Sequence, residues 1–539
     1  MKFRFKCPYC FKEISDDEVL FRSQKVDLSE EDDFPGGNPL PEPYDDIEMF
    51  EDEYEGVGKE EYLEKYKKWK QWELFHMRED PVYENFWEKY GGTTEKNLTD
   101  DKIGIEPYNR RIIIDPKDGA EFGLKKQDDG TYIFRDADGM SDRIEFETGE
   151  CSDWRVCPHC HNPLPKEYGK NHARFVTVVG IAGSGKTVFL SQLLKHMNSY
   201  CAKVRVSAIT DSPGVRSFLA ENSIADGTRL PNSTPKEQFQ QPLFFKIMKT
   251  DEKDGEEKRV TETIVLYDLA GEAFASSSDT DLYAPFVQHA DGIIMLIDPM
   301  QFPTVQNISE GNGSEKKGNP ITVLNAIHNK TVAQGRQEKK CETPIAVCIS
   351  KADCTEMQKI LGDETIQLLL DGVTGIPDGR GYNKALFNME GYRPLEKNLR
   401  TFFQQDDLGL ATLMLNNYAS YNFFAFSSLG QESRKQKGEQ GEEYQVANGN
   451  VVARRIEEPL LWLFYQFGYI GRQGLLEWEY ECPNCGAVHN HELQEGTQYE
   501  EVKKGFLGLK RRSTMWEINR ECDICHCKWN TNDKEHYFM

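Results

Sequence analysis

Long hydrophobic runs are absent from this sequence, and positively charged residues are fewer than negatively charged ones. No stretch approaches the roughly 20 apolar residues that a membrane-spanning helix needs, and the opening residues MKFRFKCPYC lack the apolar segment of a signal peptide. The 65 lysines and arginines are outnumbered by 90 aspartates and glutamates, which gives a net charge of −25. Such a charge argues against nucleic-acid binding through the overall field of the protein. We therefore expect a cytoplasmic protein without a membrane segment.

The length of 539 residues exceeds what one hydrophobic core supports and predicts three or four domains. Changes in composition predict these segments: residues 1–15 with 151–171 as a split zinc ribbon, 16–57 as an acidic linker, 58–150 as a helical and small β insert, 172–471 as the main α/β domain, and 478–539 as a second zinc ribbon. Residues 16–55 hold 16 acidic and two basic residues, which favours a solvated linker over a specific docking segment. From residue 172 onward, short apolar strands alternate with helices, the pattern of a mostly parallel α/β sheet.

Cysteine is plentiful, and eight of the 14 cysteines form Cys-x-x-Cys pairs. The pairs are Cys7/Cys10, Cys157/Cys160, Cys482/Cys485 and Cys522/Cys525. In a cytosolic chain such pairs indicate zinc more often than disulfides. Because tetrahedral zinc takes four ligands, two pairs must meet to close one site. We therefore expect two structural zinc sites.

The two C-terminal pairs are separated by 36 residues that include aromatic and β-prone stretches. This spacing predicts a zinc ribbon, with Cys527 as a spare ligand. The two N-terminal pairs must meet across the insert to share a zinc ion, and His159, His161 and Cys151 are alternative ligands there or bystanders. A closed site of four cysteines stabilises a fold and does no catalysis.

A phosphate-binding loop lies between the first strand and the first helix of the α/β domain. Its sequence, GIAGSGKT at 180–187, is a complete G-x-x-x-x-G-K-[ST] motif between a strand and a helix. Backbone N–H groups of such a loop and the helix N-terminus bind phosphate oxygens. Lys186 is expected to contact the β- and γ-phosphates, and the Thr187 hydroxyl to coordinate Mg²⁺. The other predicted contacts of this loop are Gly180, Ala182, Gly183, Ser184, Gly185 and Val188.

An apolar strand that runs into TIVLYDLAGE, residues 263–272, supplies the second phosphate-side motif. Asp268 is expected to act on Mg²⁺, and the N–H group of Gly271 to sense the γ-phosphate. The polar loop DGTRLPNSTP precedes the hairpin that contains this strand, where a switch hydroxyl is expected. Thr234 is the preferred candidate and Thr228 the reserve, and the alternative is that each is an exposed loop threonine.

Two further strand ends, SKAD and FSSLG, complete the series. In this order the motifs resemble those of the Ras-like P-loop GTPases over residues 172–471. The resemblance implies that Asp353 accepts hydrogen bonds from the guanine N1–H and 2-amino groups, with the stem of Lys351 over the base. It also implies that Ser427 and Ser428 place a backbone N–H near the guanine O6.

The chain departs from that family at Ser350, where asparagine is usual, and at Glu272, where a water-orienting glutamine is usual. The first change implies weaker anchoring of the loop. The second implies slow or differently organised hydrolysis, with Glu272 as the in-chain candidate for orienting the water. The zinc knuckles, GIAGSGKT, DLAGE, FSSLG and a following PLLWLFYQFG helix together resemble the bacterial double-GTPase proteins. That resemblance implies a place in a multi-component, NTP-dependent defence or conflict system.

These motifs predict an α/β fold: a P-loop, GTPase-like, mostly parallel sheet with an antiparallel edge hairpin, flanked by small zinc-ribbon modules and an α+β insert. The predicted function is a switch that binds GTP or GDP, hydrolyses GTP slowly with Mg²⁺, and reports its state to protein partners. The alternatives are a nucleotide-binding zinc-ribbon scaffold without hydrolysis and a P-loop ATPase. The basic cluster KKGFLGLKRR at 503–512 leaves contact with nucleic acid open, although a solvated hairpin tip is the favoured interpretation.

Overall fold

The computed structural model describes the greater part of the chain, with gaps. The described residues are 3–24, 59–76, 78–90, 110–181, 183–231, 241–253, 256–274, 277–308, 318–332, 339–372, 385–406, 408–437, 443–472, 479–481, 488–490, 497–504, 510–521 and 528–531. Beyond residue 471 only backbone positions are described. Within these ranges, no helix is both long enough and apolar enough to cross a membrane.

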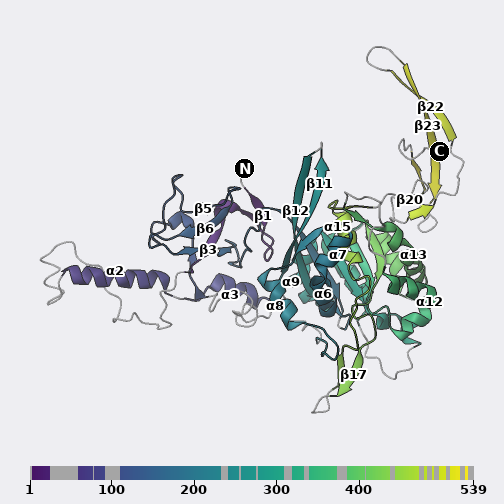
Figure 1. Cartoon of the computed structure of the whole chain (residues 1–539), viewed down its shortest axis with the longest axis horizontal. Coiled ribbons are helices and arrows are strands. Elements are labelled where there is room, and N and C mark those ends of the chain that lie inside the picture. Colours follow the sequence, from purple (N-terminus) through teal and green to yellow (C-terminus); the bar gives the residue numbers. More distant parts are fainter. Residues whose placement is uncertain are drawn as a thin grey trace.

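Seven strands form the central sheet of the larger body (Figure 1). Their order across the sheet is β10-β11-β12-β9-β13-β14-β16. The strands are β9 (His172–Gly180), β10 (Ser207–Ile209), β11 (Leu243–Lys253), β12 (Glu256–Ala270), β13 (Gly292–Ile297), β14 (Ile345–Ile349) and β16 (Tyr421–Ala425). β11 is antiparallel to both its neighbours. The other five strands, β12, β9, β13, β14 and β16, are parallel to one another. The predicted mostly parallel sheet with an antiparallel hairpin is confirmed, and the unpredicted three-residue β10 adds one strand outside that hairpin.

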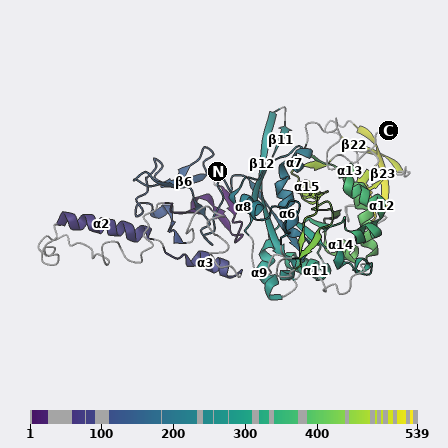
Figure 2. The same ribbon diagram turned by 60° about the horizontal axis from the view of Figure 1, so that its bottom comes forward.

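Helices cover both faces of this sheet (Figures 1 and 2). On β9, Val176 and Val178 share a buried cluster with α6 and α15, whereas Phe175 and Val179 share another with α9 and α11. This period of two is that of a strand buried on both faces. The helices of this body are α6 (Lys186–Lys195), α7 (Met197–Lys203), α8 (Pro213–Glu221), α9 (Ser277–Gln288), α10 (Pro303–Gln306), α11 (Pro320–Thr331), α12 (Thr355–Asp371), α13 (Met389–Gln405), α14 (Leu410–Asn417) and α15 (Glu458–Gln466).

Residues from both sides of the predicted insert form one N-terminal module (Figure 1). β3 pairs with both β4 and β8, so that Leu20 lies opposite Val156. Buried Asp16 forms an ion pair with buried Arg155, at 3.3 Å, across the same junction. The elements of the module are β1 (Arg4–Lys6), β2 (Glu13–Ser15), η1 (Asp16–Glu18), β3 (Leu20–Arg22), α2 (Lys59–Phe75), α3 (Pro81–Glu88), β4 (Ile113–Ile114), η3 (Pro116–Asp118), β5 (Phe134–Arg135), β6 (Ser141–Glu145), β7 (Cys151–Ser152) and β8 (Arg155–Val156).

The N-terminal module packs on the face of the central sheet that α9 covers. The ring of Phe11 lies against those of Phe175 and Phe286, with centroids 5.8 and 5.1 Å away. The hydroxyl of Tyr267, a buried residue of β12, donates a hydrogen bond to the carbonyl oxygen of Pro8 at 2.7 Å. A single buried cluster therefore runs from the first cysteine turn into the sheet.

Phenylalanine at position 267 is expected to lower the free energy of unfolding by about 1–2 kcal/mol, because the buried carbonyl of Pro8 would lose its donor while the ring kept its packing. Thermal unfolding measures the change. The matched control is Tyr66→Phe, which removes the hydroxyl of a half-buried ring on α2. Equal unfolding temperatures for the two variants would show that the Tyr267–Pro8 bond does not hold the module to the sheet.

The remaining strands form small separate sheets. β15 (Leu386–Phe387) pairs with β19 (Gly471–Arg472), and β17 (Arg434–Lys437) pairs with β18 (Glu443–Val446). Near the C-terminus, β20 (Glu479–Glu481) pairs with β21 (Val488–Asn490), and β23 (Lys510–Glu521) lies between β22 (Thr497–Lys504) and β24 (Lys528–Thr531). The C-terminal candidate ligands, Cys482, Cys485, Cys522, Cys525 and Cys527, lie outside the described residues. The C-terminal zinc site therefore stays a prediction.

Candidate functional site

The GIAGSGKT loop links the C-terminal end of β9 to the start of α6. Gly185 has φ of +78°, in the left-handed region that glycine adopts without strain, and it caps α6. Lys186 is the first residue of that helix and is buried, and its Nζ donates to the carbonyl oxygen of Gly180 at 2.6 Å. The lysine is therefore folded over its own loop, beside the positive end of the helix dipole.

A cavity of about 580 Å³ borders this loop. The predicted nucleotide contacts that line it are Gly183, Ser184, Gly185, Lys186, Thr187, Val188, Ser350, Lys351, Asp353, Ser427 and Ser428. These residues come from three motifs that are far apart in the sequence. A cavity of this size falls in the range of small-molecule sites. The phosphate loop and the two predicted base-reading loops therefore share one cavity.

Asp268 and Gly271 lie where β12 ends, next to the phosphate loop. Asp268 is buried, and its Oδ1 atom has no hydrogen-bond partner among the described residues. Burial raises the pKa of this carboxyl group, and the charge of Lys186 opposes that shift. At Gly271 a Cβ atom would lie 2.9 Å from the Gly180 carbonyl carbon and the Ile181 nitrogen. Only glycine fits this close approach, so the Asp-x-x-Gly turn is held directly against the phosphate loop.

Asp353 is the buried carboxylate of the cavity. Its side chain is 8% exposed, and its Oδ2 atom has no partner among the described residues. Burial raises the pKa of Asp353, and a hydrogen bond with the Ser427 side chain acts in the opposite direction. Because a buried acceptor without a donor is unfavourable, the position suits a ligand that brings N–H groups. Ser350 donates its hydroxyl to the carbonyl oxygen of Ile297 at 3.1 Å, so serine still supplies one anchoring hydrogen bond to this loop.

Lys351 connects the predicted base-reading loop to the phosphate loop. Its backbone has φ of +51°, a conformation that residues with side chains seldom adopt and that is found at functional sites. Its Nζ donates to the carbonyl oxygen of Gly183 and to Asp298 Oδ2, the latter at 2.7 Å. Asp298 is buried directly after β13, where it begins η5 (Pro299–Gln301), and the sequence did not predict its role. The sequence signal that could have identified Asp298 is its position directly after a buried strand, β13, which pairs with β9.

Three residues of the predicted nucleotide site fall wholly or partly outside the described structure. Ala182 and Thr234 lie in gaps, and the side chain of Glu272, on η4 (Gly271–Phe274), is not described. Thr228 is described and does not line the cavity. Its hydroxyl accepts a hydrogen bond from the Ala225 N–H at 3.1 Å within a local turn. The switch hydroxyl and the water-orienting residue therefore stay predictions.

Two further segments contribute to the cavity wall. Leu230 and Pro231 precede the gap at 232–240, and Lys435 and Tyr444 come from the β17–β18 hairpin. Leu230 and Pro231 belong to the loop DGTRLPNSTP, in which the switch hydroxyl is predicted. The sequence did not predict the contacts of the hairpin, because the charged stretch QESRKQKGEQGEEYQV has the composition of a solvent-exposed loop.

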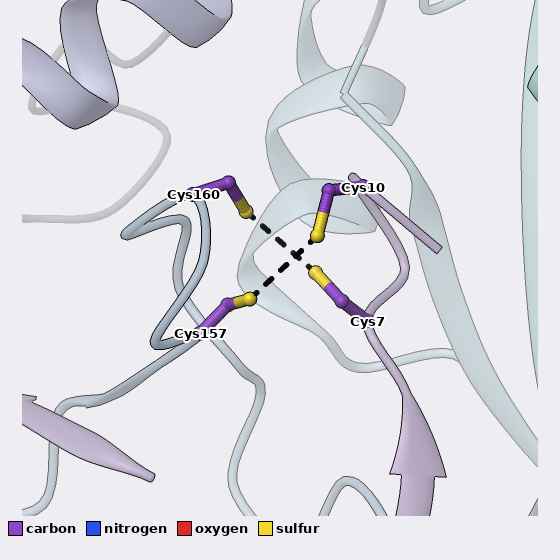
Figure 3. A group of neighbouring side chains, drawn as sticks. All are labelled: Cys7, Cys10, Cys157 and Cys160. Atoms are coloured by element: carbon purple, nitrogen blue, oxygen red, sulfur yellow. Dashed lines mark hydrogen bonds between the residues drawn. The ribbon is translucent and has the colours of Figure 1, made fainter. Parts of the chain in front are cut away.

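The N-terminal cysteines form a second candidate site (Figure 3). Its members, Cys7, Cys10, Cys157 and Cys160, have sulfur atoms within 4.8 Å of one another. Opposite pairs, Cys7 with Cys160 and Cys10 with Cys157, have sulfurs 3.7 Å apart. The two turns are alike, since Phe11 and His161, which follow the second cysteine of each pair, both have positive φ.

The chemistry of this group suits a metal ion. The backbone N–H groups of Tyr9 and His159 donate to the sulfurs of Cys7 and Cys157 at 3.4 and 3.3 Å. Burial raises the pKa of the Cys7 thiol, so a set of thiolates here needs a compensating cation. Four cysteine sulfurs around one point are the donors of a closed tetrahedral site.

The other N-terminal candidate ligands lie outside this group. Cys151 is exposed. The Nδ1 atom of His161 forms hydrogen bonds with the carboxylate of Asp80 at 2.9 and 3.0 Å, and Asp80 also accepts a bond from Arg22 at 2.6 Å. His161 therefore ties the second cysteine turn to the start of α3.

Residues 174–372 match the model of the family Double-GTPase 2. The matched segment contains the phosphate loop, the Asp-x-x-Gly turn and the SKAD loop. The predicted resemblance to double-GTPase proteins is confirmed, and the match supports GTP binding.

A curated relative and several solved structures also resemble the chain. The "Putative ESX-1 scaffolding and assembly protein SaeC" of Mycolicibacterium smegmatis is 28% identical over 255 residues, which are 43% of this chain and 60% of the relative. The chain thus spans less than two thirds of the length of that relative. Among similar solved structures, the S. cerevisiae Ski7 GTPase-like domain bound to GTP is 14% identical with a TM-score of 0.23, and the match covers 48% of this chain and 43% of that chain. The structure of sup35 complexed with GDP is 10% identical with a TM-score of 0.19, covering 48% of this chain and 38% of that chain. An Aquifex aeolicus Era variant bound to GDP and AlF4− is 13% identical with a TM-score of 0.16, covering 48% of this chain and 52% of that chain.

Proposed function

We propose that this protein is a GTP-binding switch and a slow Mg²⁺-dependent GTPase. The observation that carries the proposal is one cavity lined by both the phosphate-loop Lys186 and the buried carboxylate of Asp353, whose Oδ2 atom lacks a partner among the described residues. The lysine suits a polyphosphate, and the carboxylate suits a base edge with two adjacent N–H donors. Guanine offers that edge in its N1–H and 2-amino groups, whereas adenine does not.

On the phosphate side, Thr187 and Asp268 are the residues that would hold Mg²⁺. The buried Oδ1 of Asp268, which has no partner among the described residues, fits a cation there. When bound, Mg²⁺ neutralises charge on the β- and γ-phosphate oxygens. The N–H of Gly271 and the hydroxyl of Thr234 would sense the γ-phosphate, and Glu272 would orient the attacking water. Loss of the γ-phosphate would release both segments, which is the switch.

We also assign zinc to the four-cysteine group, because closed sets of four thiolates select this ion. Zinc would fix the first cysteine turn, and with it the ring of Phe11 that packs on the sheet. The nucleotide state would be read by protein partners in a multi-component bacterial assembly. The name of the mycobacterial relative, a scaffolding and assembly protein, supports this part of the proposal.

The purified protein is expected to bind a fluorescent GTP analogue at least about 100-fold more tightly than the matching ATP analogue, because a site built for N–H donors rejects a base that lacks them. Lys186→Ala is expected to remove most of the affinity. Lys195→Ala, at the exposed end of the same helix, is the matched control and should bind as the wild type does. Equal affinity for both nucleotides, or a preference for ATP, would favour a P-loop ATPase instead.

A nucleotide-binding scaffold without useful hydrolysis is the second candidate, and the name of the mycobacterial relative, a scaffolding protein, favours it. Phosphate release under multiple-turnover conditions separates the two. Turnover by the wild type that is lost in Lys186→Ala would exclude the scaffold. Tight GTP binding without phosphate release would instead establish it.

A further inference from the structure

A two-stranded hairpin follows the predicted base-reading loop of Ser427 and Ser428 and projects from the larger body (Figure 1). Its strands, β17 and β18, pair with each other and not with the central sheet. Lys435 on β17 lies opposite Gln445 on β18. The hairpin therefore does not extend the central sheet, and it contacts the rest of the protein at its base.

The strand β18 is bonded to the segment that leads into residues 232–240, where the switch threonine is predicted. Residues 226–231 form what we term the switch stem. Three backbone hydrogen bonds of 2.8–2.9 Å join the two segments: Leu230 N–H to Gln445 O, Gly227 N–H to Ala447 O, and Ala447 N–H to Thr228 O. The guanidinium of Arg229 also lies over the ring of Tyr444, 4.7 Å from its centroid. The hairpin and the switch stem are thus one bonded unit.

The start of the hairpin is bonded to the base-reading side of the cavity. Glu432, two residues before β17, accepts hydrogen bonds from the backbone N–H and the hydroxyl of Thr355, at 2.7 and 3.1 Å. Thr355 begins α12 and lies two residues after Asp353. The hairpin therefore connects the loop that would recognise the base with the stem of the loop that would sense the γ-phosphate.

The hairpin also supplies side chains to the cavity itself, namely Lys435 and Tyr444. The two other lysines that line the cavity are engaged, Lys186 with the phosphate loop and Lys351 with Asp298. Lys435 is exposed and forms no ion pair with a residue in the described ranges. It adds a positive charge to a cavity proposed to hold a polyanion.

We propose that the β17–β18 hairpin is a nucleotide clamp, in which Lys435 and Tyr444 contact the bound nucleoside triphosphate and β18 transmits that contact to the switch stem. The inference rests on the proposed function, because it takes the cavity to hold GTP. Lys435 meets an anionic phosphate oxygen, and Tyr444 closes the cavity beside Arg229. Nucleotide release and loosening of the switch stem are then one event.

Lys435→Ala is expected to speed dissociation of fluorescent GDP and GTP analogues from the full-length protein about tenfold, the effect of losing one charged contact. The matched control is Lys437→Ala, which truncates the same side chain two residues along the same strand, at a position that does not line the cavity. The control should differ from the wild type by less than about twofold. Equal dissociation rates for the two variants would overturn the clamp.

Hydrogen exchange tests the link to the switch stem. In the wild type, the amides of Gly227, Leu230 and Ala447 are expected to exchange more slowly when a GTP analogue binds, and Lys435→Ala should reduce this protection. Protection confined to the phosphate loop would refute transmission through β18.

If the wild type binds no GTP, the proposed function fails. If the wild type binds GTP and Lys435→Ala releases it at the same rate, only the clamp fails.

Discussion

Asparagine in place of Asp353 is expected to weaken GTP binding by about 100-fold or more, because the amide oxygen can accept only one of the two guanine N–H donors and the amide N–H₂ group faces the other donor. The same change should improve binding of xanthosine triphosphate relative to GTP. Xanthine carries a carbonyl where guanine carries its 2-amino group, so the asparagine N–H₂ group finds an acceptor. Burial raises the pKa of Asp353. Wild-type GTP affinity should therefore fall on acidification at a higher pH than an exposed aspartate would give.

Parallel titrations of the wild type and Asp353→Asn with fluorescent GTP and XTP analogues measure this change in specificity. Asp363→Asn is the matched control, since it makes the same substitution at an exposed position on the helix that follows the loop. The control should keep the wild-type ratio of affinities. An unchanged ratio in Asp353→Asn as well would mean that this carboxylate does not contact the base.

Serine in place of Cys7 is expected to remove one zinc ion per chain and to destabilise the N-terminal module by about 3–5 kcal/mol, the penalty for breaking a buried charged set. Cys7 is fully buried, and the hydroxyl of serine is a poor substitute for a thiolate. The first cysteine turn would then lose its shape. Because Phe11 and Pro8 of that turn contact the central sheet, the unfolding temperature of the N-terminal module together with the central sheet should fall by about 10 °C.

Metal analysis of the purified variant and a thermal unfolding scan test this expectation. Cys151→Ser is the control, because Cys151 lies in the same module, is exposed and stands outside the four-cysteine group. It should keep both the zinc content and the unfolding temperature of the wild type. A Cys7→Ser protein with undiminished zinc would show that the group does not bind this ion.

The central sheet was predictable because its strands are short, apolar and bounded by motifs with one structural setting. The GIAGSGKT loop fixed the position of β9 and α6, and the run ending at Asp268 fixed β12. By contrast, β10 has only three residues, two of them exposed, so no apolar pattern reveals it. The meeting of the N-terminal cysteine pairs followed from the ligand count of zinc rather than from any local pattern.

What escaped prediction depends on contacts between distant segments. Asp298 has the appearance of an ordinary strand end until Lys351, 53 residues later, is seen to bond to it. Phe11 resembles a core residue of a small module, yet its ring packs on the central sheet. Lys435 and Tyr444 lie in a charged stretch whose composition indicates solvent exposure, and only the cavity identifies them. Pairings of this kind are set by topology, which composition does not encode.

Two features of the N-terminal module set the order in which this chain can fold during synthesis. β3 pairs with β8, and two distant cysteine turns form one group. Cys10 and Cys157 are 147 positions apart, so a ribosome needs roughly 10–30 seconds after making the first turn to reach the second. Until then the first two thiols cannot meet the second pair, so a metal ion could not be held by all four. Once residue 160 has emerged, the module can close before most of the central sheet has been synthesised. The nascent sheet then meets a finished surface, with Phe11 and Pro8 already in place to receive β12 and α9.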